Sequence, residues 1–309
     1  MGLMSVSRRP WIALWAAITL AVPATLQAQE PPASIGLKEV QVTAGGKSAR
    51  VRYKHYPAPG STDAIIYLHG DLPNEEMRKA GKDEAFLKYF NLIEKRLQKF
   101  SAERKLQTVM IARPGYIWSS GDARERRTEL HYRWIREAIV AIVGELRIER
   151  YALAGQSGGS TAAAMVVALG DTATPCVILG SGGYSWIATS RHQNRVFDRR
   201  PLTAEEEARG MSRVADPIQR VRDIAVIPAR RFVLLADPRD KRTPFAAQVE
   251  FWSALRGRGH DAKLVVRAAS GAEFHSMSNH AMSAAETCLA ETRSQPRWPA
   301  PMIDGPAKE

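Results

Sequence analysis

Cysteines and long apolar runs are scarce in this 309-residue sequence, whose only cysteines are Cys176 and Cys288. A chain of this length buries a full hydrophobic core and needs no disulfide or metal site to fold. The one membrane-like apolar run lies at the extreme N-terminus, which excludes a protein with several membrane spans. A composition of 45% hydrophobic and 25% charged residues also excludes a disordered chain, a collagen and a coiled-coil rod.

The N-terminal segment is typical of an export signal over residues 1–28. Arg8-Arg9 precede an apolar run over residues 11–22, which is too short to span a bilayer comfortably. Cleavage after Ala28 fits best, and cleavage after Ala24 is the alternative. The sequence therefore predicts a periplasmic or secreted protein with no stable membrane anchor after cleavage. An uncleaved anchor is the competing interpretation.

That compartment bears on the two cysteines. In an exported protein Cys176 and Cys288 can form one disulfide. Two buried, unpaired thiols are the alternative, and the sequence leaves both open. Neither cysteine has a neighbour that suggests a catalytic thiol.

The charge balance is basic, because 44 Lys and Arg residues outnumber 32 Asp and Glu residues. Such a surface attracts anions. The basic residues are dispersed, however, which favours the interpretation that they simply solvate the outer helices. Their densest cluster contains Arg124, Arg126 and Arg127. We expect no nucleic-acid partner, because the sequence has no zinc-finger cysteine spacing, no ribonucleoprotein aromatic box and no basic tract with interleaved aromatics.

Strand-like and helix-like segments alternate along the chain after a hairpin over residues 35–56. Short apolar runs without alternation predict buried strands, and the amphipathic or alanine-rich segments between them predict helices. This order predicts an α/β fold with a mostly parallel central sheet and helices on both faces. The predicted strands cover residues 64–68, 109–112, 151–154, 177–179, 232–236 and 263–267, and helices include 86–100, 161–169 and 281–290.

One helix is indicated by a stripe of apolar residues alone. Leu130, Trp134, Ala138 and Ile142 recur every four residues, which predicts a narrow buried face. His131 is then expected on an exposed flank of this helix.

Residues 184–216 interrupt the alternation and are polar and rich in arginine. At this place in the chain an insertion predicts a small cap or lid over the edge of the sheet. A long solvated loop with one helix around residues 204–211 is the alternative. The mature domain is expected to span residues 29–309, with a loose tail over 294–309.

The main chemical signal is the turn Gly155-Gln156-Ser157-Gly158-Gly159, between an apolar strand and an alanine-rich helix. A tight strand-to-helix turn requires glycines two residues before and two after the serine, because side chains there would collide. The same turn places Ser157 at a helix N-terminus, where the field favours a developing anion. The sequence predicts Ser157 as a nucleophile. A glycine-rich turn without catalysis is the alternative.

A serine nucleophile needs a base, and the base needs an acid to orient it. Among the seven histidines, His275 lies past the last predicted strand and before the last helix, and His280 is the reserve. Asp237 and Asp240 both follow the strand at 232–236, and either could be the acid. The order Ser, Asp, His along the chain is typical of one class of serine hydrolases.

The oxyanion of the reaction needs two donors already in place. One is expected to be the backbone N–H of Gly158, directly after the nucleophile. The other is expected in the turn His69-Gly70-Asp71, as the N–H of Asp71. An ordinary turn that ends a strand is the alternative for these three residues.

Together these residues resemble the α/β-hydrolase superfamily over nearly all of residues 35–292. The stretch around Asp240 looks like the catalytic domain of prolyl-oligopeptidase-type and dienelactone-hydrolase-type members, where the acid lies four residues before a proline. Asp240-Lys241-Arg242-Thr243-Pro244 fits this pattern and Asp237 does not, so the resemblance favours Asp240. No β-propeller precedes the domain, and Glu273-Phe274-His275 departs from the more usual Gly-x-x-His.

The resemblance implies a serine hydrolase that cleaves a carboxylic ester through an acyl-enzyme. The N-terminal segment adds that it is exported, and no motif in the sequence implies a metal or organic cofactor. A small peptidase or amidase is the runner-up, followed by an acyltransferase and, last, a non-catalytic binding protein. The expected partner is a small ester or a short peptide. Arg191, Arg195 and Arg199 in the predicted cap would favour an acidic acyl or leaving group.

Overall fold

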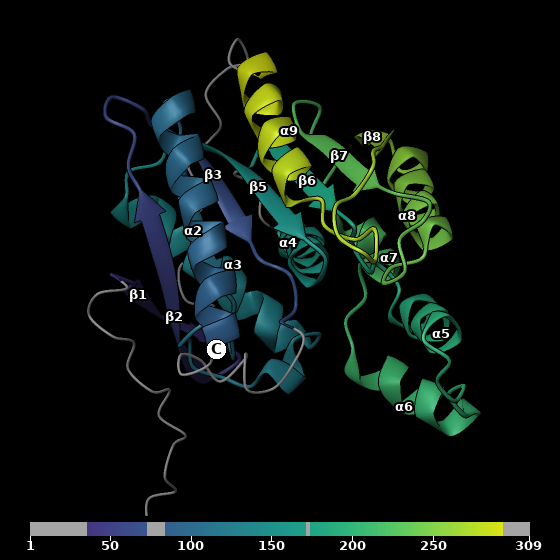
Figure 1. Ribbon diagram of the computed structural model, residues 1–309. Coiled ribbons are helices and arrows are strands. Elements are labelled where there is room, and N and C mark those ends of the chain that lie inside the picture. The colour runs from purple at the N-terminus through teal and green to yellow at the C-terminus, as the bar shows by residue number, and fades with distance from the viewer. Residues whose placement is uncertain (1–35, 73–83, 171–173, 293–309) are drawn as a thin grey trace, which may run out of the picture.

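The structure, a computed structural model, describes residues 36–72, 84–170 and 174–292. Within these ranges an eight-stranded sheet has the order β1-β2-β4-β3-β5-β6-β7-β8 (Figure 1). β1 and β2 pair antiparallel, as do β2 and β4, and the other neighbours are parallel. The predicted α/β fold with a mostly parallel sheet is confirmed. The strands are β1 (Lys38–Ala44), β2 (Lys47–Tyr56), β3 (Asp63–Leu68), β4 (Gln107–Ala112), β5 (Arg150–Gln156), β6 (Cys176–Gly180), β7 (Arg231–Ala236) and β8 (Asp261–Val266).

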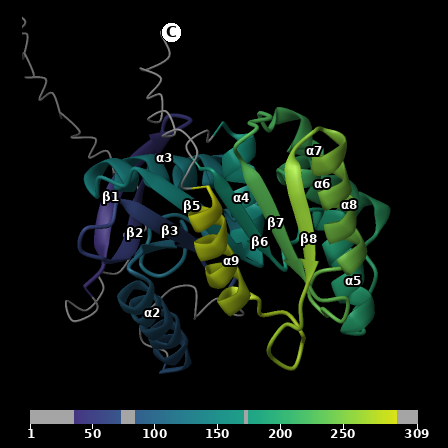
Figure 2. The ribbon, with the colours of Figure 1, turned by 90° about the horizontal axis from the view of Figure 1, so that it is seen from above.

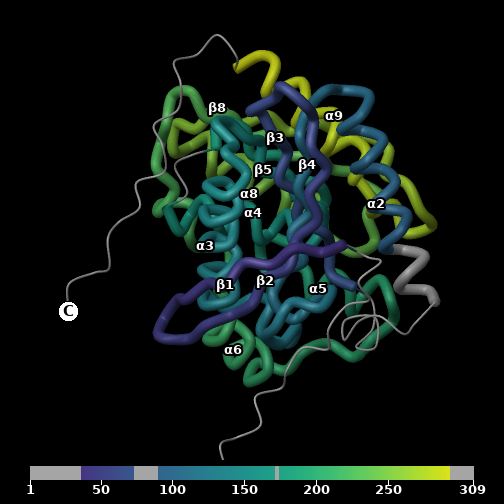
Figure 3. The backbone as a smooth tube through the Cα atoms, turned by 90° about the vertical axis from the view of Figure 1, so that its left-hand side faces the viewer, coloured from purple at the N-terminus to yellow at the C-terminus, as the bar shows by residue number. Residues whose placement is uncertain are grey.

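Helices cover both faces of the sheet, which explains why its central strands are apolar without alternation. Every residue of β4 and of β6 is buried. α2 (Glu84–Arg104) and α9 (Ser278–Glu291) lie on one face, and α3 (Glu129–Glu145), α4 (Gly158–Ala168) and α8 (Phe245–Gly257) lie on the other (Figures 2 and 3). Each face has its own apolar core, one containing Phe90 and Met282 and the other Met165 and Phe251.

The buried face of α3 is wider than the predicted stripe. His131 and Tyr132 are almost fully buried together with Trp134 and Ile135. The prediction of an exposed His131 is wrong. His69 and Asp71 in the turn after β3, and Arg113 and Arg126 in the segment after β4, lie close enough to act electrostatically on its ring, so this flank of α3 faces those segments and not solvent. Neither ring nitrogen of His131 has a hydrogen-bond partner among the described residues.

The segment predicted as a cap contains two helices, α5 (Trp186–Val196) and α6 (Ala204–Arg213), at the lower right of Figure 1. Thr203 and Glu206 form a reciprocal capping box that fixes the start of α6. The indole of Trp186 lies so close to Gly210 that a β-carbon there would collide with it. The described residues also form the short helices α7 (Pro217–Arg220), η2 (Ala123–Glu125) and η3 (Val221–Asp223).

Two predicted segments, the export signal at 1–28 and the loose tail at 294–309, lie outside the described residues. In the part of the chain that the structure describes, no helix is both long and apolar enough to cross a membrane. Over the same residues, no group of three or more His, Cys, Asp or Glu side chains is arranged to hold a metal ion.

Candidate active site

The turn at Ser157 joins the carboxyl end of β5 to the first residue of α4. Ser157 has φ 54° and ψ −121°. Residues other than glycine seldom adopt this backbone conformation, which costs about 1–3 kcal/mol. A β-carbon on Gly155 would collide with the main chain of Gly159, and one on Gly159 would collide with the carbonyl of Leu68. The glycines that the motif contains are therefore required by close packing of the backbone around the serine.

Two main-chain hydrogen bonds hold the strained residue in place. The Ser157 N–H donates to the Gly180 carbonyl at 2.8 Å, and the Ser157 carbonyl accepts from the Thr161 N–H at 3.1 Å. Ser157 is half-buried. No hydrogen bond joins its hydroxyl to His275 or to any other side chain among the described residues, so the hydroxyl is held at the surface of the turn by the backbone alone.

His275 and Asp240 form a direct pair at the same edge of the sheet. The Nδ1 atom of His275 lies 2.9 and 3.0 Å from the two carboxylate oxygens of Asp240. Asp240 is buried and also accepts hydrogen bonds from the Arg242 N–H and from the N–H and hydroxyl of Thr243. Because a carboxylate only accepts, Nδ1 carries the proton, and in the neutral ring Nε2 is then the acceptor. This is the tautomer that a general base requires.

The side chain of Gln156 connects the serine turn to the histidine loop. Its Nε2 donates to the His275 carbonyl at 2.8 Å, and its Oε1 accepts from the Met277 N–H at 2.8 Å. Gln156 is buried, and a β-carbon on Gly180 would lie 3.3 Å from its Oε1. The residue before the nucleophile thus fixes the backbone directly after His275, on both sides of Ser276. Sequence reasoning missed this role, although an amide at the end of an apolar strand is a signal for it.

His69 controls the orientation of the next peptide in the turn after β3. Its Nδ1 lies 2.7 Å from the Gly70 carbonyl, and its Nε2 accepts from the Arg113 N–H at 3.4 Å. Burial, aided by Arg113, lowers the pKa of His69 to about 3, so the ring is neutral. The Gly70 carbonyl and the Asp71 N–H belong to one planar trans peptide and point in opposite directions. Holding the carbonyl on His69 therefore turns the Asp71 N–H away from the ring.

Gly70 itself lies against the nucleophile turn, since a β-carbon there would be 3.2 Å from the Cβ of Ser157. The carboxylate of Asp71 packs directly on Gly158, so closely that a β-carbon on Gly158 would collide with it. The structure thus brings the turn after β3 and the first residues of α4 into contact at one place.

Asp71 is held there by two arginines. Its Oδ1 accepts from Arg113 Nη2 at 2.7 Å, and its Oδ2 accepts from Arg126 Nε at 3.0 Å. Burial raises the pKa of Asp71, but Arg113 and Arg126 outweigh that effect and hold it well below its usual range. The guanidinium of Arg113 is fully buried and stacks over the ring of Tyr116 at 4.6 Å. Sequence reasoning did not find this ion pair.

Known proteins match this chain in structure and not in sequence. No family model and no curated protein matches the sequence. The esterase Pf2001 of Pyrococcus furiosus aligns with a TM-score of 0.57 at 14% identity, over 87% of this chain and 98% of the esterase. The acylaminoacyl peptidase of Pyrococcus horikoshii aligns with a TM-score of 0.52 at 14% identity, over 82% of this chain and 39% of the peptidase. Est1E from Butyrivibrio proteoclasticus aligns with a TM-score of 0.50 at 13% identity, over 82% of this chain and 98% of Est1E.

The chain has the α/β-hydrolase fold. Its sheet order and the positions of the turns after β3, β5, β7 and β8 agree with the resemblance found in the sequence. In α/β sheets of this kind, ligands bind outside the carboxyl ends of the strands. Ser157, His275 and Asp240 all follow such ends, as does Asp71.

The two reserve residues lie elsewhere in the α/β-hydrolase fold. Asp237 accepts from the N–H groups of Arg239 and Ala269 and pairs with the Arg239 side chain. The hydrogen bonds from Arg239 hold the pKa of Asp237 well below its usual range. His280 is exposed on α9, with Nε2 3.1 Å from the Ala268 carbonyl. No interaction joins either residue to His275 or Ser157 among the described residues, and Asp237 braces the loops after β7 and β8.

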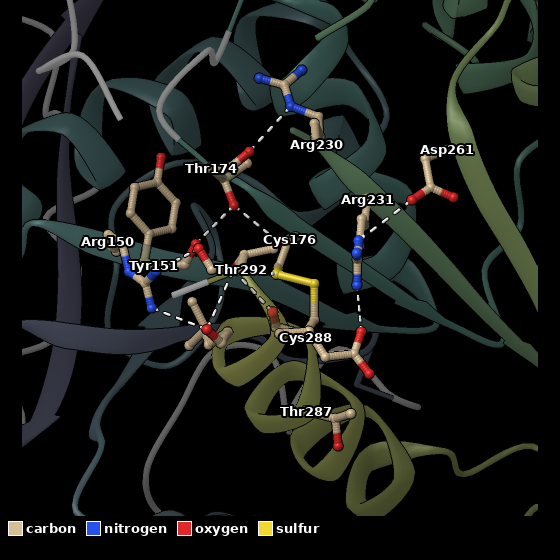
Figure 4. The surroundings of a disulfide bond; sticks show 12 residues. Arg150, Tyr151, Thr174, Cys176, Arg230, Arg231, Asp261, Thr287, Cys288 and Thr292 are labelled. Atoms are coloured by element: carbon tan, nitrogen blue, oxygen red, sulfur yellow. Dashed lines mark hydrogen bonds and ion pairs between the residues drawn. A yellow bond between two sulfur atoms is a disulfide. The ribbon is translucent and has the colours of Figure 1, made fainter. Parts of the chain in front are cut away.

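The two cysteines meet at the end of β6 that is opposite to the candidate site. Cys176 begins β6, and Cys288 lies on α9 (Figure 4). Their sulfur atoms form a disulfide, with the Cα atoms 6.0 Å apart and the two residues 112 positions apart in the sequence. Thr174 and Thr292 donate to the carbonyls of the two cysteines at 2.9 Å each. In this α/β-hydrolase fold the bond ties the helix after the His275 loop to the strand whose last carbonyl accepts from Ser157.

Proposed function

We propose that this protein is an exported serine hydrolase that cleaves a carboxylic ester through an acyl-enzyme. The observation that carries the proposal is the His275–Asp240 pair, whose free Nε2 lies on the same sheet edge as the strained Ser157. Gln156 supports it further, because its side chain bonds directly to the His275 loop. The structural likeness to esterases fits this proposal.

In the proposed mechanism Ser157 Oγ attacks the ester carbonyl while its proton passes to His275 Nε2. Asp240 stabilises the imidazolium through Nδ1–H. The tetrahedral intermediate then expels the alcohol, which takes the proton from Nε2, and leaves an ester bond between the acyl group and Ser157. Water attacks this acyl-enzyme with His275 again as base, and the acid is released as Ser157 regains its proton.

The negative oxygen of each tetrahedral intermediate would accept hydrogen bonds from the N–H groups of Gly158 and Asp71. The neutral His69 ring supports this role, because it holds the Gly70 carbonyl on the opposite side of the shared peptide. Donors fixed before the reaction stabilise the developing charge without reorganising during it. The positive end of α4 adds a favourable field at the same place.

Export is supported by the disulfide between Cys176 and Cys288. Disulfides persist in oxidising compartments and are rare in the cytosol of most organisms. This agrees with the export signal expected over residues 1–28 and supports a periplasmic or secreted location for the proposed hydrolase.

A fluorophosphonate probe tests whether the protein is a serine hydrolase. The intact protein should be labelled on Ser157, and Ser157→Ala should not be labelled, with Ser160→Ala as a matched control that keeps the labelling. A panel of acyl esters and aminoacyl amides then separates an esterase from a peptidase, which is the second candidate given the likeness to an acylaminoacyl peptidase. Absence of labelling in the folded wild-type protein would leave the binding-protein alternative.

Gln156→Met should lower kcat by about 10²-fold with little change in KM, because displacing a catalytic group by about 1 Å has an effect of this size. The methionine keeps the length of the side chain but removes its bonds to His275 and Met277. Initial rates on para-nitrophenyl acetate give kcat and KM separately, and a thermal melt shows that the variant is folded. A kcat within threefold of the wild type would exclude this positioning role.

A further inference from the structure

Three guanidinium groups surround the first residues of α4. Arg113 and Arg126 bind the Asp71 carboxylate that packs on Gly158. Arg127 donates through Nη1 to the Gly183 carbonyl at 3.2 Å, and the same carbonyl accepts from the hydroxyl of Thr161 on α4 at 3.1 Å. Arg127 also pairs with Asp216 at 3.3 Å. Three cations and two carboxylates leave one positive charge beside the proposed oxyanion site.

The three arginines differ in what they can still bind. The side chain of Arg113 is 1% exposed and that of Arg127 is 16% exposed, whereas that of Arg126 is 38% exposed. Arg126 donates through Nε to Asp71 and through Nη1 to the Ala123 carbonyl at 3.2 Å. Its Nη2 has no partner among the described residues, so Arg126 is the accessible cation of the group and keeps a free donor.

The cap arginines are less suited to this role. Arg191 forms two hydrogen bonds with Glu207, and Arg200 forms two with Glu206. These charges are neutralised on the surface of the cap helices, and Arg199 stacks on Phe197 at 5.6 Å. The segment after β4 instead carries its net positive charge beside the Asp71–Gly158 contact.

We propose that Arg126, with Arg127 behind it, forms an anion subsite that binds a carboxylate on the substrate next to the Asp71–Gly158 contact. The negative charge of Asp71 is offset, because Arg113 and Arg126 together bring two positive charges to its one carboxylate. The subsite rests on the proposed hydrolase function and narrows its substrates to esters with a negatively charged acyl or leaving group.

Two matched ester pairs test the subsite. Para-nitrophenyl hydrogen glutarate and para-nitrophenyl pentanoate differ in a carboxylate on the acyl side, and para-acetoxybenzoate and para-acetoxybenzamide differ in a carboxylate on the leaving side. For each pair the ratio of kcat/KM, anionic over neutral, is measured for the wild type, Arg126→Gln, Arg126→Lys and Arg124→Gln. Arg124 is the control, because it lies in the same segment but pairs with Asp122 on the surface.

In at least one pair the wild type should prefer the anionic ester. Arg126→Gln should lower that ratio by about 10-fold or more, the effect of one hydrogen bond to a charged group. Arg126→Lys should keep part of the preference, Arg124→Gln should keep all of it, and added salt should reduce it in the wild type. If Arg126→Gln leaves the ratio unchanged in both pairs, the subsite is overturned, and the proposed hydrolase function is not affected. Failure of the wild type to hydrolyse any of the four esters would instead count against the hydrolase.

Discussion

Asp240→Asn should lower kcat for ester hydrolysis by about 10⁴-fold, the size of effect seen when the acid of such a triad is replaced by its amide. The carboxylate of Asp240 accepts the Nδ1–H of His275 with both oxygens. An amide in its place offers a donor as well, and it would allow the tautomer whose proton is on Nε2. That tautomer cannot take the proton of Ser157. Steady-state rates on an activated ester measure the loss.

Asp237→Asn is the matched control for that experiment. Asp237 lies three residues earlier in the same loop and is equally buried, but it binds Arg239 and the Ala269 N–H instead of His275. We expect its kcat to stay within a few fold of the wild type in the folded protein. A larger loss in Asp237→Asn than in Asp240→Asn would reverse the assignment of the acid.

The free energy of unfolding of the double variant Cys176→Ser, Cys288→Ser should be about 3 kcal/mol lower than that of the wild type. The bond closes a loop of 112 residues. Without it the unfolded chain gains conformational entropy, which favours unfolding. Both cysteines are buried, so the serines also place two hydroxyls in an apolar setting. Urea denaturation of both proteins, monitored by tryptophan fluorescence, gives the difference.

A reductant provides the internal check on the disulfide. Dithiothreitol should lower the urea midpoint of the wild type and leave that of the double variant unchanged. Titration of the denatured wild type with a thiol reagent should find thiols only after reduction. Two free thiols in unreduced protein would mean that the bond is absent in solution.

The sheet and the serine turn were accessible from the sequence because both depend on local signals. Non-alternating apolar runs mark strands that are buried on both faces, as in β4 and β6. The glycines around Ser157 are fixed by collisions between backbone atoms only a few residues apart, and one close approach to Leu68. Signals of this kind survive in any sequence that forms the same turn.

The contacts that surround the turn were not accessible, because they join residues far apart in the chain. Asp71 and Arg113 are separated by 42 residues, and Gln156 and Met277 by 121. Nothing in the local pattern pairs one arginine with one carboxylate among the many available. His131 shows the same limit, since its burial depends on neighbouring segments that helix periodicity does not describe.

Helix α5 has a consequence for any attempt to redesign the specificity of this protein. His192 Nε2 lies 3.1 Å from the Asp240 carbonyl oxygen, and Gln193 Nε2 donates to the Arg242 carbonyl at 2.9 Å. The insertion and the acid loop therefore share hydrogen bonds, and a graft that exchanges residues 184–216 for a foreign segment would remove two supports of that loop. Successful chimeras will need to carry an equivalent pair of donors at the junction.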